Sequence, residues 1–297
     1  MQRKGIALLT TLMFVIVITV SLGYALTQVN NASDLVKEEK FLYQTSFLVE
    51  DILKILNNSS QIQEIVDNNS SEGLAILLAQ SMFIPLKLEE TKLILKISSA
   101  RSRYNPSEFT SENMPIMKQY LNVKMVNSQY GDILFDVISG IKDDNSYNSR
   151  IFDDNPTLFR DYIVSSKHLK KVNDFYAREY NDDALKNINF EQLFYYTKDK
   201  NISIDLNYAS QEVWEMCTGV SEERANDLQL NGFGAYTSLE DLGLNSIELE
   251  KLSKFKTSFF EPILLIKLLI KKDNNKANIS FEYDIKQKKG SNFVYEI

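Results

Sequence analysis

The chain begins with Met1-Gln2-Arg3-Lys4-Gly5 and continues with IALLTTLMFVIVITVSLGYAL, residues 6–26. This second piece contains neither a charged residue nor a proline. An apolar run of about 20 residues is long enough to cross the hydrocarbon core of a bilayer as one helix. The basic residues Arg3 and Lys4 precede the run, and such residues tend to stay on the cytoplasmic side. We therefore expect a single membrane-spanning helix at 6–26, with the rest of the chain across the membrane.

The composition argues against most catalytic sites. The chain has 297 residues, of which 44% are hydrophobic and 25% charged, as in ordinary globular proteins. Its single cysteine, Cys217, cannot form an internal disulfide. With a single histidine, His168, a Cys/His zinc site, a Cys–His pair and a Ser–His–Asp triad are each nearly excluded. The sequence has neither a GxxxxGK[ST] nor a GxGxxG motif. Its net charge of −7 argues against general affinity for nucleic acids. We expect a protein that is not an enzyme.

Three interpretations of the N-terminal stretch compete. A cleaved signal peptide is one, and Gly23-Tyr24-Ala25 offers small residues for cleavage, but the apolar run exceeds the roughly 7–15 residues of such peptides. A plain signal anchor is the second. The third follows from Arg3-Lys4-Gly5 standing directly before Ile6, which resembles the leader of a type IV pilin-like protein. In such proteins a prepilin peptidase cuts after the glycine, so Ile6 would become the mature N-terminus.

An amphipathic helix is predicted next, at residues 35–56. Ser33 or Asp34 can cap its start, and the polar run 57–60 ends it. Apolar residues recur at helical spacing along one face and beside it, namely Phe41, Leu48, Ile52 and Ile55, then Leu42, Val49 and Leu56. A membrane helix that runs into an amphipathic helix is typical of pilins. It also fits the first helix of an ordinary domain behind an anchor.

Strand patterns occur in two distant parts of the sequence. Residues 83–88 and 91–97 predict a hairpin, and residues 260–272, 277–287 and 292–297 predict three further strands. The run 260–272 is apolar almost throughout, which predicts a central strand buried on both faces. Short helices are expected at 62–66 and 74–81, and the long region between the strand groups is mostly helical, with apolar stripes at 133–141 and 158–176. The helical block is therefore expected to be inserted into one sheet.

Acidic residues cluster in two loops of the helical block. Asp143 and Asp144 form one cluster, and Asp153 and Asp154 form the other. Carboxylates are ligands that calcium prefers. Their spacing is not that of an EF-hand loop, and acidic loops are also common as solvated turns and helix caps. Calcium binding is one of two interpretations that the residues allow.

Residues 211–228 fit a helix-hairpin-helix unit. Gly219 and Val220 would form the tight turn, because glycine tolerates a left-handed backbone. Ser221 can cap the second helix, and the small Ala225 lets the two helices approach. Residues 238–255 resemble a second, looser unit. Such units often bind the DNA backbone, but residues 201–260 contain four basic and ten acidic side chains, and phosphate binding relies on basic ones. A protein-contact or structural role is favoured.

Several of these features together resemble general secretion pathway protein K, the large minor pseudopilin of type II secretion systems. The leader ends at Gly5, before Ile6. The stretch Ser102-Arg103-Tyr104-Asn105 is similar to the family's Gly-Arg-Phe-Asn, and residues 204–210, Ile-Asp-Leu-Asn-Tyr-Ala-Ser, resemble its Ile-Asn-Val-Asn-Thr-Ala-Ser. The hairpin at Gly219 and the terminal strands then follow in the family's order. The resemblance covers most of the chain.

The resemblance implies an α+β, pilin-like fold in which a long N-terminal helix packs on an antiparallel sheet and a large, mostly α-helical insert contains the helix-hairpin-helix-like unit. It divides the chain into a leader (1–5), a transmembrane helix (6–26), the amphipathic helix with the first part of a pilin-like domain (27–127), the insert (128–257, with the hairpin unit at 201–257) and the terminal strands (258–297).

The resemblance also implies a role in assembly. The protein would lie in the bacterial inner membrane with its C-terminal domain in the periplasm, be N-methylated at Ile6, and cap and nucleate the pseudopilus. Its partners would be other minor pseudopilins, the prepilin peptidase, the inner-membrane assembly platform, and exported cargo or the outer-membrane channel. Thr10 stands where major pilins have a glutamate that neutralises the N-terminal amine of the neighbour ahead, which suits a filament tip.

The resemblance implies calcium too. The family's acidic loop is kept only in part at 135–144, so the calcium ligands do not transfer cleanly.

Two alternatives remain open from the sequence. The chain could belong to a type IV pilus or DNA-uptake apparatus, with the hairpin unit contacting DNA. It could also be an unrelated periplasmic binding module on a membrane anchor.

Overall fold

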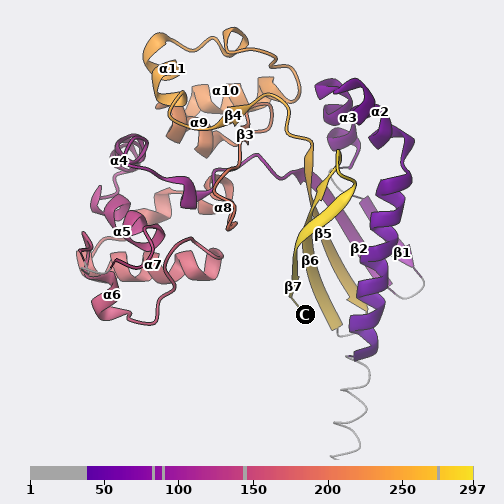
Figure 1. The fold of residues 1–297 in the computed structure, drawn as a ribbon, viewed down its shortest axis with the longest axis horizontal. Helices are drawn as coiled ribbons and strands as arrows, with labels where there is room; N and C mark the ends of the chain where they lie inside the picture. The colour runs from indigo at the N-terminus through magenta and orange to yellow at the C-terminus, as the bar shows by residue number, and fades with distance from the viewer. Residues whose placement is uncertain (1–38, 82–83, 89–90, 143–145, 273–274, 297) are drawn as a thin grey trace, which may run out of the picture.

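The computed structural model describes residues 39–81, 84–88, 91–142, 146–272 and 275–296. Its first helix is described from residue 39 to residue 58 and lies along one face of a sheet (Figure 1). The buried stripe of this helix consists of Phe41, Thr45, Val49, Ile52 and Leu56. The helix is as predicted, but the predicted face is rotated, because Ile55 is 68% exposed and Leu42 is 42% exposed.

Two short helices, α2 (Ser60–Asn68) and α3 (Ser71–Ser81), follow and confirm the predicted pair. Ser59 caps α2 by accepting a hydrogen bond from the N–H of Ile62. Together with the first helix they cover one face of the sheet, and the three helices share a hydrophobic core with its strands.

The main sheet has five antiparallel strands, and its order places distant segments side by side. The strands are β1 (Ile84–Leu88), β2 (Thr91–Ser99), β5 (Ile263–Lys272), β6 (Asn275–Asp284) and β7 (Lys289–Glu296), in the order β1-β2-β5-β6-β7. Lys96 of β2 lies directly opposite Lys267 of β5. The chain between these two strands is thus an insertion into one sheet, as the sequence predicts.

β5 is central, but the prediction that both of its faces are buried is wrong. Leu264, Ile266, Leu268 and Ile270 face the helices and are at most 1% exposed. On the opposite face Lys267 is exposed and Leu269 is 42% exposed. The apolar run misled the prediction because leucines occupy both faces while only one face carries the helical layer.

The inserted part is mostly helical and has its own hydrophobic core. Its elements are η1 (Pro106–Glu108), α4 (Met114–Val123), α5 (Gln129–Ile138), α6 (Ile151–Asp154), α7 (Ser166–Tyr180), η2 (Ala184–Asn187), α8 (Phe190–Leu193), β3 (Ile204–Asp205), α9 (Gln211–Thr218), α10 (Glu222–Gly232), η3 (Glu240–Leu242), α11 (Ser246–Leu252) and β4 (Thr257–Ser258). β3 and β4 form a small parallel sheet.

The helical part differs from the prediction in detail. Its core already includes Tyr104, Phe109 and the apolar side of α4, so it begins before the predicted residue 128. Ile141 lies beyond the end of α5 and is 82% exposed, because the helix stops at Ile138. Leu158 precedes α7 and belongs to a non-helical segment.

Among the described residues, no helix is both long and apolar enough to cross a membrane. The predicted span at 6–26 lies outside these residues, as do Gly5, Ile6, Thr10, Asp143 and Asp144.

Candidate functional site

The stretch at residues 204–210, singled out by its resemblance to a family motif, lies where the chain leaves the helical part for β5. Asp205 is fully buried there. Its Oδ1 accepts a hydrogen bond from the N–H of Asn207 (3.0 Å), and its Oδ2 accepts one from the N–H of Glu261 (2.9 Å). Burial penalises the charged carboxylate and raises the pKa of Asp205 to about 7, although the two N–H donors oppose this shift.

Asn207 connects three segments of the same junction. Its Nδ2 donates to the carbonyls of Tyr236 (2.9 Å) and Phe259 (2.7 Å), and its Oδ1 accepts from the N–H of Tyr236 (2.8 Å). Ser210 caps α9 and donates from its Oγ to the carbonyl of Gln192 (2.7 Å). The polar residues of this motif therefore hold backbone segments together.

The helix-hairpin-helix unit has the predicted local geometry. Gly219 ends α9 with a φ of 76°, a left-handed conformation that favours glycine. Ser221 caps α10 by accepting from the N–H of Arg224 (3.4 Å). Ala225 is fully buried between the helices, and Val220 is 8% exposed.

The polar groups of the hairpin are already engaged within the protein. The N–H of Gly219 donates to the carbonyl of Glu215 (2.9 Å), and that of Val220 donates to the Oγ1 of Thr218 (3.3 Å). Arg224 donates to the carbonyl of Gly243, and Glu222 and Glu223 are exposed beside the turn. The exposed carboxylates of Glu222 and Glu223 would repel a phosphate at this turn, whereas Lys251, against Gly219, is one cation beside it. This balance of charge favours a structural role for the unit.

A buried charge cluster, missed at the sequence level, fixes α9 against α4. The Nζ of Lys124 lies 2.7 Å from the Oε2 of Glu215 and 3.3 Å from the Oε2 of Glu212, and both carboxylates are buried. The hydroxyl of Tyr120 also donates to Glu212. Burial opposes the charge of Lys124, but the two carboxylates prevail and raise its pKa. The partners are so far apart in sequence that no local pattern signals the contact.

The described acidic residues of the loops do not gather into a metal site. Asp153 and Asp154 are both exposed at the end of α6, and Asp154 faces Arg178 at 3.6 Å. Among the described residues, no group of three or more His, Cys, Asp or Glu side chains could hold a metal ion. Since Asp143 and Asp144 lie outside these residues, calcium binding at 143–154 stays a prediction.

One buried carboxylate in this region has a clear structural role. Asp136 accepts four hydrogen bonds, from the N–H and Nδ2 of Asn148 (3.0 Å each) and from the N–H and Oγ of Ser149 (2.7 Å each). It thereby fixes the far end of the loop that follows α5.

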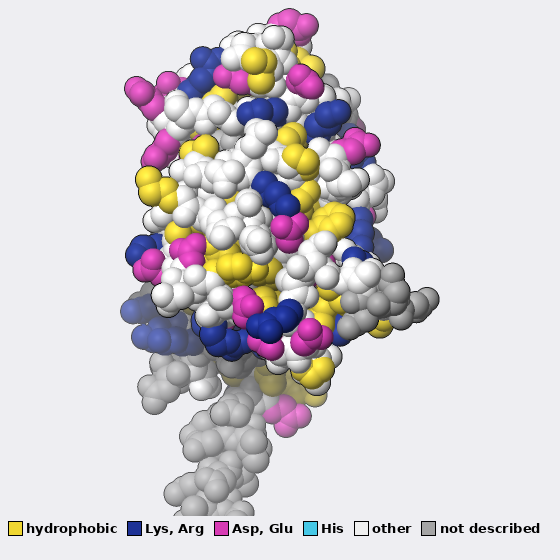
Figure 2. All heavy atoms as spheres, turned by 90° about the vertical axis from the view of Figure 1, so that its left-hand side faces the viewer, with side chains coloured by type: hydrophobic (Ala, Val, Ile, Leu, Met, Phe, Trp, Pro, Cys, Tyr) yellow, Lys and Arg dark blue, Asp and Glu magenta, His cyan; other side chains and the backbone are white. Residues whose placement is uncertain are grey.

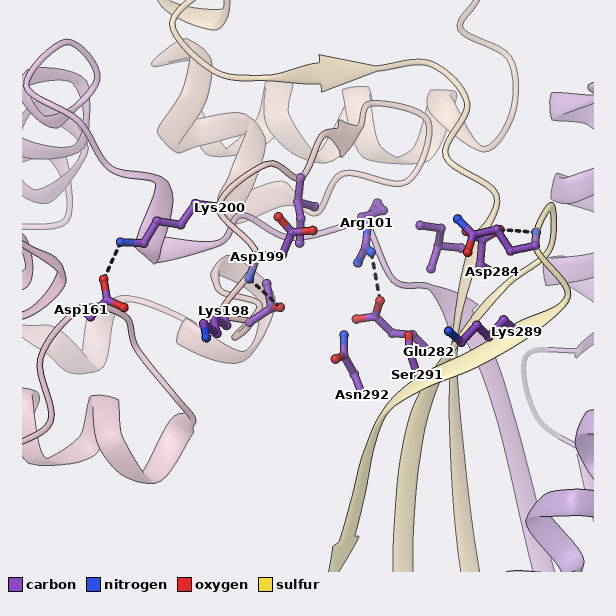
Figure 3. A pocket seen from close by; sticks show the side chains of 14 residues that line it. Arg101, Asp161, Lys198, Asp199, Lys200, Glu282, Asp284, Lys289, Ser291 and Asn292 are labelled. Carbon is purple, nitrogen blue, oxygen red and sulfur yellow. Dashed lines mark hydrogen bonds and ion pairs between the residues drawn. The ribbon is translucent and has the colours of Figure 1, made fainter. Parts of the chain in front are cut away.

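A cavity of about 1000 Å³ lies between the sheet and the helical part (Figure 3). Four of its charged side chains form two ion pairs. Arg101, just after β2, lies 2.9 Å from Glu282 of β6, and Lys200 lies 2.9 Å from Asp161. The Arg101–Glu282 pair is buried and joins the linker directly to the sheet.

The first helix presents an apolar strip to solvent. Tyr43, Phe47 and Ile55 are 61%, 64% and 68% exposed. The separation of four residues places Tyr43 next to Phe47, and Ile55 follows two turns further along, beyond the exposed Asp51. An exposed apolar strip of this kind is typical of a surface that packs against another protein.

No protein-family model and no curated protein matches the sequence. A solved structure does match the fold. It is a chain in the crystal structure of the GspK-GspI-GspJ complex from the type 2 secretion system of enterotoxigenic Escherichia coli. The TM-score is 0.53 at 10% sequence identity, and the match covers 88% of this chain and 99% of that one.

The fold is α+β and pilin-like. The resemblance drawn from the leader, the motif at 204–210 and the strand order is thereby confirmed at the level of the fold.

Proposed function

We propose that this protein is a minor pseudopilin of a type II secretion system, which caps the pseudopilus tip and helps to nucleate the filament. The observation that carries the proposal is the fold. A first helix packs on an antiparallel sheet, and a helical part is inserted between β2 and β5, in a likeness that covers nearly the whole of a chain from a secretion complex. The leader-like sequence before Ile6 supports it independently.

In this account the N-terminal segment has two successive environments. The uncharged stretch 6–26 first holds the protein in the inner membrane, with the folded domain in the periplasm. After cleavage behind Gly5 and methylation of Ile6, it joins the helical core of the filament. The strip of Tyr43, Phe47 and Ile55 then packs against neighbouring subunits, and full burial of each side chain contributes on the order of 1.5–3 kcal/mol.

Two features support a place at the tip. Thr10 lacks the carboxylate that would neutralise a subunit ahead. The helices α9, α10 and α11 lie beyond the upper end of the sheet, whereas residue 39 lies at its lower end (Figure 1). A helical part in this position would obstruct a subunit stacking from above. The proposed partners are other minor pseudopilins, the prepilin peptidase and the assembly platform, together with cargo or the outer-membrane channel.

The DNA-uptake alternative rests on the hairpin unit alone. Because the carboxylates of Glu222 and Glu223 lie exposed beside its turn, that unit would repel a DNA backbone. The first helix packed on the sheet likewise argues against an unrelated binding module.

Co-purification with the other minor pseudopilins of the same system, in a neutral detergent, tests the proposal. We expect a complex with the native chain and its weakening or loss with Phe47→Asp, which places a charge in the apolar strip. Ser46→Asp is the matched control, because it adds the same charge at an exposed neighbouring position without removing apolar surface. A native chain that forms no such complex would contradict the proposal.

A further inference from the structure

The face of the sheet that is turned away from the first helix carries rows of lysines. Residues two apart in a strand share a face, so Lys92, Ile94 and Lys96 of β2 lie together. Their cross-strand partners on β5 are Lys271, Leu269 and Lys267. Two lysine pairs therefore flank an apolar pair, and like charges placed directly opposite each other destabilise a sheet. Such an arrangement calls for a compensating anion.

A groove of about 720 Å³ lies over part of this face. Its floor consists of strands β2, β5, β6 and β7 and includes Ile94 and Leu269. Its opposite wall belongs to the helical part, through Ser165 and Ser166 at the start of α7 and through the loop at 195–196. Lys96, Lys267 and Arg103 all line it.

The charges of Glu191 and Glu282 act on Arg103, and that of Glu191 acts on Lys267, but neither carboxylate forms an ion pair with them. Among the described residues, none of the three forms an ion pair, and Arg103 donates only to the backbone carbonyl of Glu191 (3.2 Å). Partial desolvation of Lys267 by its surroundings in the groove, followed by the charges of Arg103 and Lys96, lowers its pKa against the opposing charge of Glu191. The start of α7 adds the positive end of a helix dipole.

Two acidic side chains also line the groove. Glu282 is held by Arg101, and Glu296 lies near the end of β7. Neither neutralises Lys96 or Lys267.

We propose that this groove is a docking site for an extended, acidic segment of a partner protein, with carboxylates against Lys96, Lys267 and Arg103 and apolar side chains against Ile94 and Leu269. Within the groove the charged row of Lys96 and Lys267 and the apolar row of Ile94 and Leu269 lie two residues apart, which is the spacing of successive side chains on one face of an extended chain. Ser165, Ser166 and Tyr196 of the helical part line the groove together with the strands, so a narrow extended chain fits the groove better than a flat bilayer or a nucleic-acid duplex does. Figure 2 shows the side of the molecule on which the helical part lies. The inference rests on the groove itself and does not depend on a role in secretion.

Fluorescence anisotropy tests the proposal with the full chain in a neutral detergent at low salt. The probe is a labelled peptide of Glu-Ser-Val-Ser repeats, which alternates glutamate and valine along one face of an extended chain, and it is compared with a peptide of Lys-Ser-Val-Ser repeats. We expect the acidic peptide alone to bind, and the double variant Lys96→Glu/Lys267→Glu to weaken its binding about tenfold or more. Lys271→Glu is the matched control, because it reverses a charge on the same face of β5 outside the groove, and it should change the affinity less than about twofold.

Lys96→Gln/Lys267→Gln, which removes both charges without reversing them, should give a smaller loss, and near-UV circular dichroism should show all variants folded. Equal affinity for both peptides, or an equal loss with Lys271→Glu, would overturn the proposal. So would capture by phosphatidylglycerol vesicles that depends on Lys96 and Lys267 in the absence of peptide binding, since that would assign the face to lipid.

Discussion

Asp205 shows how a residue recognised from a motif can have a role that the motif does not reveal. In the sequence it is part of a stretch that resembles a family motif. The structure places its carboxylate, fully buried, between two backbone N–H groups at the junction of the helical part and the sheet. No cation compensates it among the described residues, which is why burial dominates its pKa.

This burial makes the stability of the junction depend on pH. The pKa of Asp205 is about 7 in the folded chain and near 4 when unfolded, so folding takes up a proton between these values. The ionised carboxylate lowers the free energy of unfolding, and this effect is complete above pH 7. It disappears as the pH falls toward 4, because the buried carboxyl group takes up a proton. When the pH is lowered from about 8 to about 5, we expect the free energy of unfolding of the native chain to rise. This rise should exceed that of the Asp205→Asn variant by about 1–3 kcal/mol.

The measurement is urea unfolding, followed by the fluorescence of the single tryptophan. This residue, Trp214, is buried in the core of the helical part. The two proteins are compared by how steeply their free energy of unfolding changes with pH. The absolute values do not serve, because Asp205→Asn also replaces an acceptor by a donor and shifts the stability at every pH. Identical slopes for the two proteins would show that Asp205 does not titrate in this range.

At the scale of elements, local patterns predicted most of the fold. The first helix, the α2–α3 pair, the strands and the hairpin at Gly219 follow from periodicity, caps and glycine. The predictions that failed concern which face of the first helix and which faces of β5 are buried. The outward position of Ile55 and the exposed side of β5 depend on which element covers which face, and that is decided by residues far away in sequence.

The charge cluster of α4 and α9 illustrates the same limit for the candidate site. Counted along the sequence, Glu212 and Glu215 made the hairpin unit look acidic, whereas in the structure Lys124 compensates both. Only the packing of α4 on α9 brings these charges together. The contacts of the junction residues and the cationic groove could not be predicted either, because the partners come from separate segments.

We expect Lys124→Met to destabilise the helical part by about 3–5 kcal/mol, because it leaves two buried carboxylates without a cation. Lys118→Met is the matched control on the same helix. It breaks a half-exposed pair with Asp132 and should cost about 1 kcal/mol or less. Chemical unfolding of both variants measures the difference, and equal losses would show that the buried cluster is no stronger than a surface pair.

At the scale of the whole molecule, two hydrophobic cores have separate tasks. One joins the first helix, α2 and α3 to a face of the sheet, and the other builds the helical part. The chain crosses between them after β2 and before β5, where Arg101 pairs with Glu282 and Asp205 bonds to Glu261. In the proposed function the first core supplies the filament subunit and the second supplies the cap.

The most direct test of this account is the sequence of the mature N-terminus, determined by mass spectrometry from cells with and without the prepilin peptidase. With the peptidase, the account predicts a chain that begins at Ile6 and is methylated on its amine. Without it, the account predicts an uncut chain that retains Gly5. A mature chain that begins at Met1 or at Leu26 in cells containing the peptidase would contradict it.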